Sequence, residues 1–218
     1  MTEPIRVLLA DDHAAIRAGM RLMLEQAPDI VVVGEAADGA IAVRQASALR
    51  PDVVLMDIRM PGTDGIQATR EITSAGFADV LILTTFDLDD YLFGALRAGA
   101  AGFLLKSVEP SALVEAVRRV AAGDGILAPE VTRRLLTAFV ATSPARHEKP
   151  LPPALNDLTV RERDVLTGLG RGLSNADLAA TLAITEATAK THVSRVLAKL
   201  GCTSRVQAAI LAREAGLT

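Results

Sequence analysis

Short apolar runs alternate with amphipathic stretches along the first 125 residues of the chain. Five such runs are present, at residues 5–10, 30–36, 53–57, 80–85 and 101–105. Short runs of nearly continuous apolar character are typical of strands that are buried on both faces of a parallel sheet. The intervening stretches place apolar residues three or four positions apart, as amphipathic helices do. Residues 1–125 are therefore predicted to form a doubly wound α/β domain with a five-stranded parallel sheet.

The region after residue 125 has a different pattern. One more helical segment is predicted at 129–140, where apolar residues recur on one face. Residues 141–157 lack periodicity and contain prolines at 144, 150, 152 and 153, a composition typical of a semi-rigid linker. Residues 126–156 are therefore predicted to be a helix and a Pro-rich linker between two domains.

Residues 157–218 carry start and stop signals for four helices. The start signals are three pairs with capping-box spacing and one further N-cap: Thr159 with Glu162, Ser174 with Asp177, Ser204 with Gln207, and Thr185. Glycines at 170, 172, 201 and 216 stand where these helices should end. Because the connection between the second and third helices is short, we expect a helix-turn-helix within a small all-α domain of four helices.

The third of these helices has one apolar face and one face of small and hydroxyl residues. On a helical projection the outward side chains are Ala187, Thr191, Ser194, Arg195 and Ala198, flanked by Thr188, Lys190, His192 and Lys199. Such a face fits the major groove of DNA, where bulky acids would be repelled by phosphate. An ordinary solvated helix would show the same pattern, so both interpretations stay open at this point.

Composition and charge narrow the class of protein. Only 3% of the residues are aromatic, and the single cysteine, Cys202, excludes an intramolecular disulfide. No leader-like segment or apolar run of about 18 residues is found, which predicts a cytoplasmic protein without a membrane span. Residues 1–125 have 11 Lys and Arg against 18 Asp and Glu, whereas residues 126–218 have 12 against 8. The resulting charges of −7 and +4 favour a polyanionic partner for the second domain.

Acidic residues close two of the apolar runs. Asp57 follows the run at 53–56, and Asp11 and Asp12 follow the run at 7–10. The carboxyl ends of parallel strands meet at one edge of a doubly wound sheet, so the three carboxylates should lie close together. Close carboxylates repel each other and attract a hard divalent cation such as Mg²⁺. The alternative is that each Asp merely caps the following helix.

These residues resemble a known family over nearly the whole chain. At the ends of the predicted strands, the pattern of residues resembles that of the phosphoacceptor receiver domain of bacterial response regulators. The residues that carry this resemblance are Asp11, Asp12, Asp57, Thr84, Phe103 and Lys106. Residues 158–166, 172–175, 188–193 and 199–201 resemble the LuxR-type helix-turn-helix. In this order the two halves resemble the NarL/FixJ family of two-component response regulators. The resemblance implies a flavodoxin-like receiver domain over 1–125 and a LuxR-type DNA-binding domain over 157–218.

For the acidic site, the resemblance implies that Asp57 accepts a phosphoryl group from a sensor histidine kinase. It also implies that Asp12, Asp57 and the backbone carbonyl of Arg59 hold Mg²⁺, with Asp11 acting through a metal-bound water. Positioning and charge neutralisation contribute most of the catalysis in such phosphoryl transfers. The chain is then not an enzyme that acts on an external substrate, although it would hydrolyse its own phosphoryl group slowly.

The resemblance also implies a switch. Lys106 would supply a second cation, and Thr84 would donate its hydroxyl to the phosphoryl group; the spacing from Lys106 favours Thr84 over Thr85. Phe103 would then turn into the space that Thr84 leaves. The expected outcome is a homodimer of the phosphorylated protein that binds double-stranded promoter DNA and regulates transcription, with RNA polymerase as a further candidate partner.

Family positions that contact DNA are matched by seven residues of the second domain. Lys190, Thr191 and Ser194 match positions near base edges or adjacent phosphates, and phosphate contacts are expected from Thr185, Thr188, Arg195 and Asn175. In this family the last helix, here residues 206–215, usually forms the dimer contact. Its apolar positions fit the core of its own domain equally well, so both roles stay open.

The chain departs from the family pattern at a few positions. Ser107 stands where many receivers have proline, and Ala14 likewise follows His13. His13 is expected to be a loop residue and not a metal ligand, since no second histidine lies nearby. Ala189 and Ser194 differ from the residues usual at those positions, which leaves the base preference undefined.

Two other classes of protein share features with this chain. An enzyme of the haloacid dehalogenase type also uses an aspartyl nucleophile with Mg²⁺ on a doubly wound sheet. Such an enzyme needs a second Asp two residues after the nucleophile, where this chain has Arg59. A protein-interaction module without DNA contact is the other class, and the capped helices and the charge asymmetry argue against it.

Overall fold

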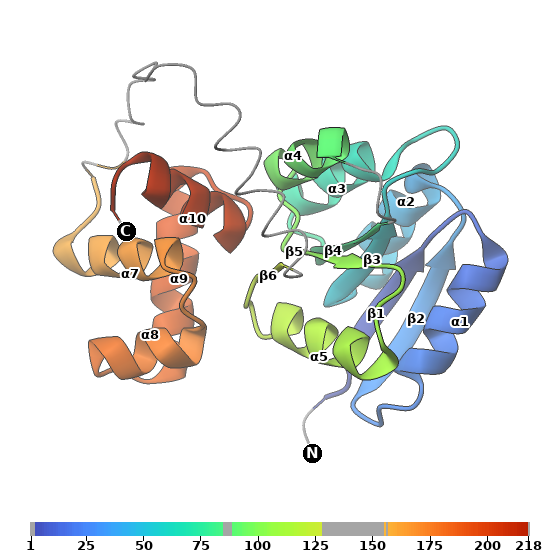
Figure 1. Cartoon of the computed structure of the whole chain (residues 1–218), viewed down its shortest axis with the longest axis horizontal. Helices are drawn as coiled ribbons and strands as arrows, with labels where there is room; N and C mark the ends of the chain where they lie inside the picture. The colour runs from blue at the N-terminus through green and yellow to red at the C-terminus, as the bar shows by residue number, and fades with distance from the viewer. Residues whose placement is uncertain (1–2, 85–88, 128–154, 156, 218) are drawn as a thin grey trace. The chain divides into compact units, whose positions relative to one another are not determined.

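The computed structural model describes residues 3–84, 89–127, 155 and 157–217 (Figure 1). Its contacts divide the chain into two units, Met1–Ala122 with Ile126–Ala128 and Gly123–Gly125 with Pro129–Thr218. The helix predicted at 129–140 and most of the Pro-rich stretch lie outside the described residues. In the described part of the chain, no helix combines the length and the apolar character needed to cross a membrane.

The first unit is built on a parallel sheet with the strand order β2–β1–β3–β4–β5–β6. Its strands are β1 (Ile5–Ala10), β2 (Ile30–Ala36), β3 (Val53–Asp57), β4 (Asp79–Thr84), β5 (Gly102–Leu105) and β6 (Ile126–Leu127). The five predicted strands are confirmed. Strand β6 was missed, because sequence analysis assigned residue 126 onward to a helix and linker. Two residues are too few to show a period of two.

Helices cover both faces of this sheet (Figure 1). They are α1 (Ala14–Leu24), α2 (Gly39–Leu49), α3 (Gly65–Ser74), α4 (Asp89–Arg97) and α5 (Pro110–Ala121). Helix α1 packs beside α5, whereas α2, α3 and α4 follow one another in a row on the other face. The central strands β1 and β3 are therefore buried on both sides, which explains why their side chains are aliphatic at nearly every position.

The second unit consists of α7 (Val160–Gly170), α8 (Asn175–Leu182), α9 (Glu186–Leu200) and α10 (Arg205–Glu214) in its described part. The predicted capping boxes at the starts of α7 and α8 are confirmed, and Thr185 caps α9. The predicted box at α10 is only half present. Ser204 accepts a hydrogen bond from the Gln207 backbone N–H, but the Gln207 side chain turns to the backbone N–H of Thr203.

The two faces of α9 lie as predicted. Ala189, Val193 and Val196 are buried in the core of the second unit, and Leu197 and Leu200 pack against it. The turn before α9 is tight, because Ala183 ends α8 in the left-handed conformation with a φ of 52°. This turn fixes the direction in which α9 leaves α8, and it leaves the hydroxyl-rich face of α9 exposed.

One buried acid joins two helices of the second unit. Glu162 accepts the backbone N–H of Thr159 at 2.8 Å, and Lys199 Nζ of α9 lies 2.7 Å from the same carboxylate. The hydrogen bond from Lys199, together with those from Thr159, lowers the pKa of Glu162 to about 2. Helix α7 is thus held to α9 by a charged interaction at its own N-cap.

This interaction should make the second unit acid-sensitive. Because the pKa of Glu162 is lowered on folding, its contribution is complete above the ordinary pKa of 4.5 and is lost as the pH falls toward about 2. We expect Glu162→Gln to unfold at a lower urea concentration than the unsubstituted chain at pH 7, with the difference shrinking at pH 2. Helical circular dichroism measures this, with the exposed Glu214→Gln as a control that should change little. An equal loss in both variants would contradict the assignment.

Candidate functional site

The parallel register brings the carboxyl ends of three strands to one edge of the sheet. Ala10 of β1 pairs with Met56 of β3, and Asp57 pairs with Leu83 of β4. Asp11, which follows β1, and Asp57, which ends β3, are both buried. Two carboxylates are thus placed in the interior at neighbouring strand ends, as predicted.

Lys106 connects these two acids. Its Nζ lies 2.7 Å from Asp11 Oδ2 and 2.9 Å from Asp57 Oδ2. Lys106 directly follows β5, and its backbone N–H donates to the carbonyl of Thr84 at the end of β4 (2.8 Å). The lysine is therefore held by the sheet itself, and only 13% of its side chain is exposed.

Burial and charge act in opposite directions on this trio. Burial raises the pKa of Asp57, and the nearby charge of Asp11 raises it further. The hydrogen bond and charge of Lys106 lower it, but the net pKa stays above the ordinary value. Burial alone would lower the pKa of Lys106, but its hydrogen bonds to Asp11 and Asp57 raise it overall. The ammonium therefore stays charged at neutral pH and compensates part of the carboxylate charge.

Asp12 and His13 complete the acidic end of β1. Ligand atoms of Asp11, Asp12 and His13 lie within 4.8 Å of one another, and His13 Nδ1 is 2.6 Å from Asp12 Oδ1. Asp57 is joined to this group through Lys106. The chemistry of the oxygen donors fits Mg²⁺, which prefers carboxylate and carbonyl ligands. His13 is an exposed loop residue at the N-cap of α1, as expected, and its ring lies against Asp12.

The remaining predicted residues of this site lie at or near the same edge. Thr84 ends β4 and is buried, and Arg59 is exposed two residues after Asp57. Phe103 is 0% exposed and pairs with Ile82 in the sheet. The resemblance implied that this ring turns inward after phosphorylation. In this structure the ring lies in the interior. Thr85, the alternative to Thr84, lies outside the described residues.

Two glycines that were not predicted from the sequence permit close backbone contacts near the site, at the starts of α3 and α2. A Cβ atom at Gly65, the first residue of α3, would lie 1.9 Å from the carbonyl oxygen of Asp57. At Gly39 it would lie 2.4 Å from the carbonyl oxygen of Thr63, in the loop that leads to α3. Only glycine lets both helices start so close to this loop. The sequence signal was a glycine after an N-cap Asp, which cannot be told from an ordinary loop glycine.

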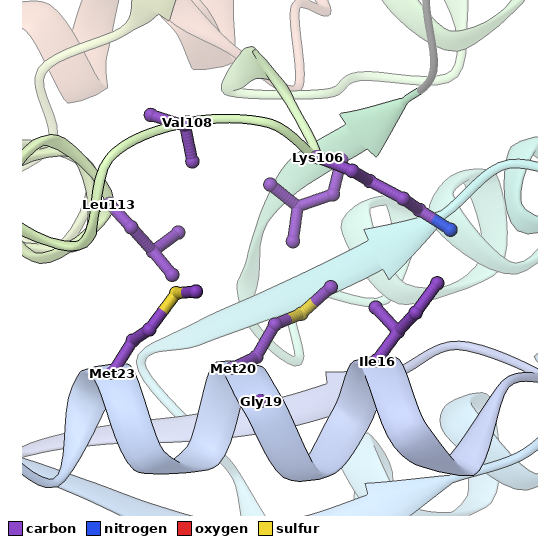
Figure 2. Close-up of a pocket in the computed structure, with 8 residues that line it drawn as sticks. Ile16, Gly19, Met20, Met23, Lys106, Val108 and Leu113 are labelled. Atoms are coloured by element: carbon purple, nitrogen blue, oxygen red, sulfur yellow. The ribbon is translucent and has the colours of Figure 1, made fainter.

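An apolar pocket lies beside this site, between α1 and the chain that follows β5 (Figure 2). Met20 and Met23 of α1 face Leu113 of α5 across it, and Lys106 lies along one side. The aliphatic part of the lysine is therefore packed, while its ammonium reaches the acids. Helix α1 thus forms part of the wall that positions Lys106.

The exposed face of α9 is the candidate nucleic-acid interface. Predicted contact residues exposed on α9 or at its N-cap are Thr185, Thr188, Lys190, Thr191, Ser194 and Arg195. The hydroxyls of Thr191 and Ser194 donate to carbonyls one turn earlier, so each oxygen is held close to the helix surface. Asn175 is the exception. Its side chain is 1% exposed, so the prediction of a phosphate contact there does not fit this conformation.

The first unit has a doubly wound sheet with buried acids and a lysine at its carboxyl edge, and the second unit has a capped helix-turn-helix. Together these features define the class of DNA-binding response regulators. The chain belongs to this family. Residues 7–118 match the model of the response regulator receiver domain, and residues 156–212 match that of bacterial regulatory proteins of the luxR family. It is therefore a two-component transcriptional regulator with a LuxR-type DNA-binding domain.

Individual relatives resemble the chain over nearly its whole length. The uncharacterized transcriptional regulatory protein YxjL of Bacillus subtilis is 38% identical over 216 residues, 99% of this chain and 98% of that protein. The nitrate/nitrite response regulator NarL of Escherichia coli is 37% identical over 209 residues, 95% and 94% of the two chains. The crystal structure of ChrA, a response regulator of a heme-sensing two-component system, covers all of both chains at 43% identity and a TM-score of 0.56.

The close approach at Gly65 yields a test of the site geometry. We expect Gly65→Ala to destabilise the first unit by about 1–3 kcal/mol, because the new methyl group overlaps the Asp57 carbonyl and α3 must shift. Gly19→Ala on α1 is the matched control, since a Cβ there meets nothing within 4 Å. It should leave stability unchanged or raise it by up to about 1 kcal/mol. Urea unfolding measures both, and equal stability of the two variants would refute the assigned role of Gly65.

Proposed function

We propose that Asp57 accepts a phosphoryl group from a sensor histidine kinase and that this modification controls promoter binding by the second unit. The observation that carries the proposal is the position of Lys106, whose ammonium lies within 3 Å of both Asp11 and Asp57. A charged lysine beside a buried carboxylate is suited to pair with an oxygen of an incoming phosphoryl group.

In the proposed transfer, one carboxylate oxygen of Asp57 forms a bond to phosphorus while the phosphorus–nitrogen bond of a phosphohistidine breaks. The leaving imidazole nitrogen then takes a proton from solvent. Lys106 pairs with an oxygen of the transferred group, and the hydroxyl of Thr84 donates to another. Because this chemistry depends on positioning and on charge neutralisation, the protein's contribution is to hold these groups in place.

A divalent cation would complete the site. Asp11, Asp12, Asp57 and the backbone carbonyl of Arg59 supply the oxygen atoms that would hold Mg²⁺, with Asp11 acting through a water. The bound ion would neutralise charge on the phosphoryl oxygens. The acidic cluster at the end of β1 supports this assignment, and the nitrogen of His13 is a poorer ligand for so hard a cation.

The modification is proposed to act through dimerisation. Helix α10 gives Ala208, Leu211 and Ala212 to the core of its own unit, while Ala209 and Ile210 are half-buried on another face. That second apolar face supports α10 as the contact of a homodimer, the role that sequence analysis left open. On the exposed side of α9, Lys190 and Arg195 are the cations offered to DNA, because Lys199 is paired with Glu162, so one copy should bind DNA weakly. Two half-sites on promoter DNA overcome this weakness.

The proposed partners place the protein in the cytoplasm, and one residue near Asp57 argues against an enzyme that acts on external substrates. A protein whose partners are a sensor kinase and promoter DNA, with contact to RNA polymerase as a further step, acts in the cytoplasm. Hydrolysis of an external phosphate ester is not proposed. The residue two positions after Asp57 is Arg59, where an enzyme of the dehalogenase type needs an acid.

The phosphoacceptor is tested by Asp57→Asn. We expect complete loss of phosphoryl incorporation from a small phosphoramidate donor with Mg²⁺, measured by intact-mass spectrometry, because the amide has no nucleophilic oxygen anion. Asp52→Asn is the control at the other end of β3, where the exposed carboxylate accepts the backbone N–H of Arg6. That variant should incorporate the group normally, and chelation of Mg²⁺ should prevent incorporation in the unsubstituted chain. Labelling retained by Asp57→Asn would move the acceptor elsewhere.

The DNA interface is tested by Lys190→Ala, with Arg70→Ala, which removes an exposed cation from α3 of the first unit, as the control. Loss of one phosphate contact should weaken binding to promoter DNA and lower the slope of log affinity against log salt by about one. Fluorescence anisotropy of labelled promoter fragments between low and moderate salt measures both quantities. Affinity unchanged in low salt for Lys190→Ala would remove this face of α9 from the interface.

A further inference from the structure

Arg17 of α1 makes two hydrogen bonds beside the acidic site that no part of the proposed chemistry uses. Its Nη1 donates to the backbone carbonyl of Asp11 at 2.6 Å, and its Nε donates to Glu35 Oε2 at 3.1 Å. Its side chain is 15% exposed, against 35% for Arg21 one turn later. Arg17 is therefore placed below the surface, directly against the loop that bears the acids.

The carbonyl that Arg17 contacts belongs to the peptide unit joining Asp11 to Asp12. Because a peptide unit is planar, holding its oxygen fixes the direction in which the chain enters Asp12. The other groups of Asp11 are also held: its backbone N–H donates to Ala36 at 3.1 Å, and its Oδ1 accepts the backbone N–H of His13 at 2.8 Å. Arg17 adds the restraint on the side that leads to Asp12.

Glu35 of β2 orients the guanidinium of Arg17. It accepts from Arg17 through Oε2 and from Arg21 through Oε1, the latter at 2.8 Å. The hydrogen bond from Arg21, and with it that from Arg17, holds the pKa of Glu35 below its ordinary value, so the carboxylate is charged at neutral pH. The two arginines thus share one acid, but the hydrogen bond to the Asp11 carbonyl comes from Arg17.

We infer that Arg17 is a positioning residue of the acidic site, which sets the orientation of Asp12 through the Asp11 carbonyl and is itself oriented by Glu35. This inference rests on the proposed function, since it assumes that Asp12 is a ligand of Mg²⁺. Outer groups that orient metal ligands typically change metal affinity by about 10–100-fold when they are removed. Arg17 acts through a backbone oxygen, so its removal should have an effect near the lower end of that range.

The test compares Arg17→Met with Arg21→Met in the full chain. Both substitutions keep a long apolar side chain and remove one ion pair with Glu35, but only the first removes the hydrogen bond to Asp11. Titration calorimetry with Mg²⁺ should show an affinity about tenfold weaker for Arg17→Met and nearly unchanged for Arg21→Met. Thermal unfolding in the presence of chelator should show similar losses of stability for both variants. Equal Mg²⁺ affinities in the two variants would overturn the inference.

Phosphoryl incorporation supplies a readout that a merely structural role would not move. A misplaced Asp12 weakens Mg²⁺ binding but leaves Asp57 and Lys106 in place, so Arg17→Met should need more Mg²⁺ and approach the normal rate at saturation. A rate that stays low at saturating Mg²⁺ would overturn the inference. If the unsubstituted chain itself binds no Mg²⁺ and takes up no phosphoryl group, the proposed function fails first, and the two failures are thereby distinguished.

Two further variants make the test independent of folding problems. Glu35→Gln should weaken Mg²⁺ binding only through Arg17, so Glu35→Gln combined with Arg17→Met should bind Mg²⁺ as weakly as Arg17→Met alone. Simple additivity of the two effects would contradict this. If Arg17→Met does not fold, Arg17→Lys keeps the charge beside Glu35 but loses the forked donor. An affinity equal to that of the unsubstituted chain would then overturn the inference.

Discussion

The first unit depends on how two buried carboxylates are kept close together. Asp11 and Asp57 lie at neighbouring strand ends, where the parallel register leaves them no freedom to separate. Lys106, which follows β5, compensates the repulsion between these two carboxylates. Its backbone N–H is held by the carbonyl of Thr84. The closeness of α3 to Asp57, which only Gly65 permits, closes the same edge from the other side. The fold thus fixes the two carboxylates close together, and the ammonium group of Lys106 compensates the repulsion between them.

The second unit also contains a lysine paired with a buried carboxylate, but there the pair has a structural role. Glu162 receives a lysine, a backbone N–H and a hydroxyl, and its pKa falls to about 2. Asp57 is also hydrogen-bonded to a lysine and to one backbone N–H, yet burial and the charge of Asp11 raise its pKa above the ordinary value. The difference lies in the number of donors set against the burial of each acid. Glu162 accepts all three hydrogen bonds on Oε2 and links α7 to α9, whereas at Asp57 burial outweighs the two donors.

Much of this arrangement could be predicted because it is written in local patterns. Strand ends follow from apolar runs, and the boxes at Thr159 and Ser174 follow from spacing. Features set by tertiary contact could not be predicted. The two-residue strand β6 is too short to show a period of two. The Gln207 side chain accepts the backbone N–H of Thr203 and not that of Ser204, which residue spacing alone does not predict. The burial of Asn175 and the close approach at Gly65 depend on segments remote in sequence or on the path of the backbone.

The geometry also bears on why the site would respond to phosphorylation. Lys106 occupies carboxylate oxygens of Asp11 and Asp57, the same two residues that the proposed function assigns to Mg²⁺. Two cations held by the same carboxylates would weaken each other's binding, because each raises the potential that the other must overcome. A phosphoryl group on Asp57 would remove this conflict, since it brings oxygens of its own for the lysine. The lysine would then move from two carboxylates to a single new group while its backbone stays tied to Thr84. A change at Asp57 would thereby be coupled to Thr84 at the end of β4 and to the end of β5, two residues after Phe103.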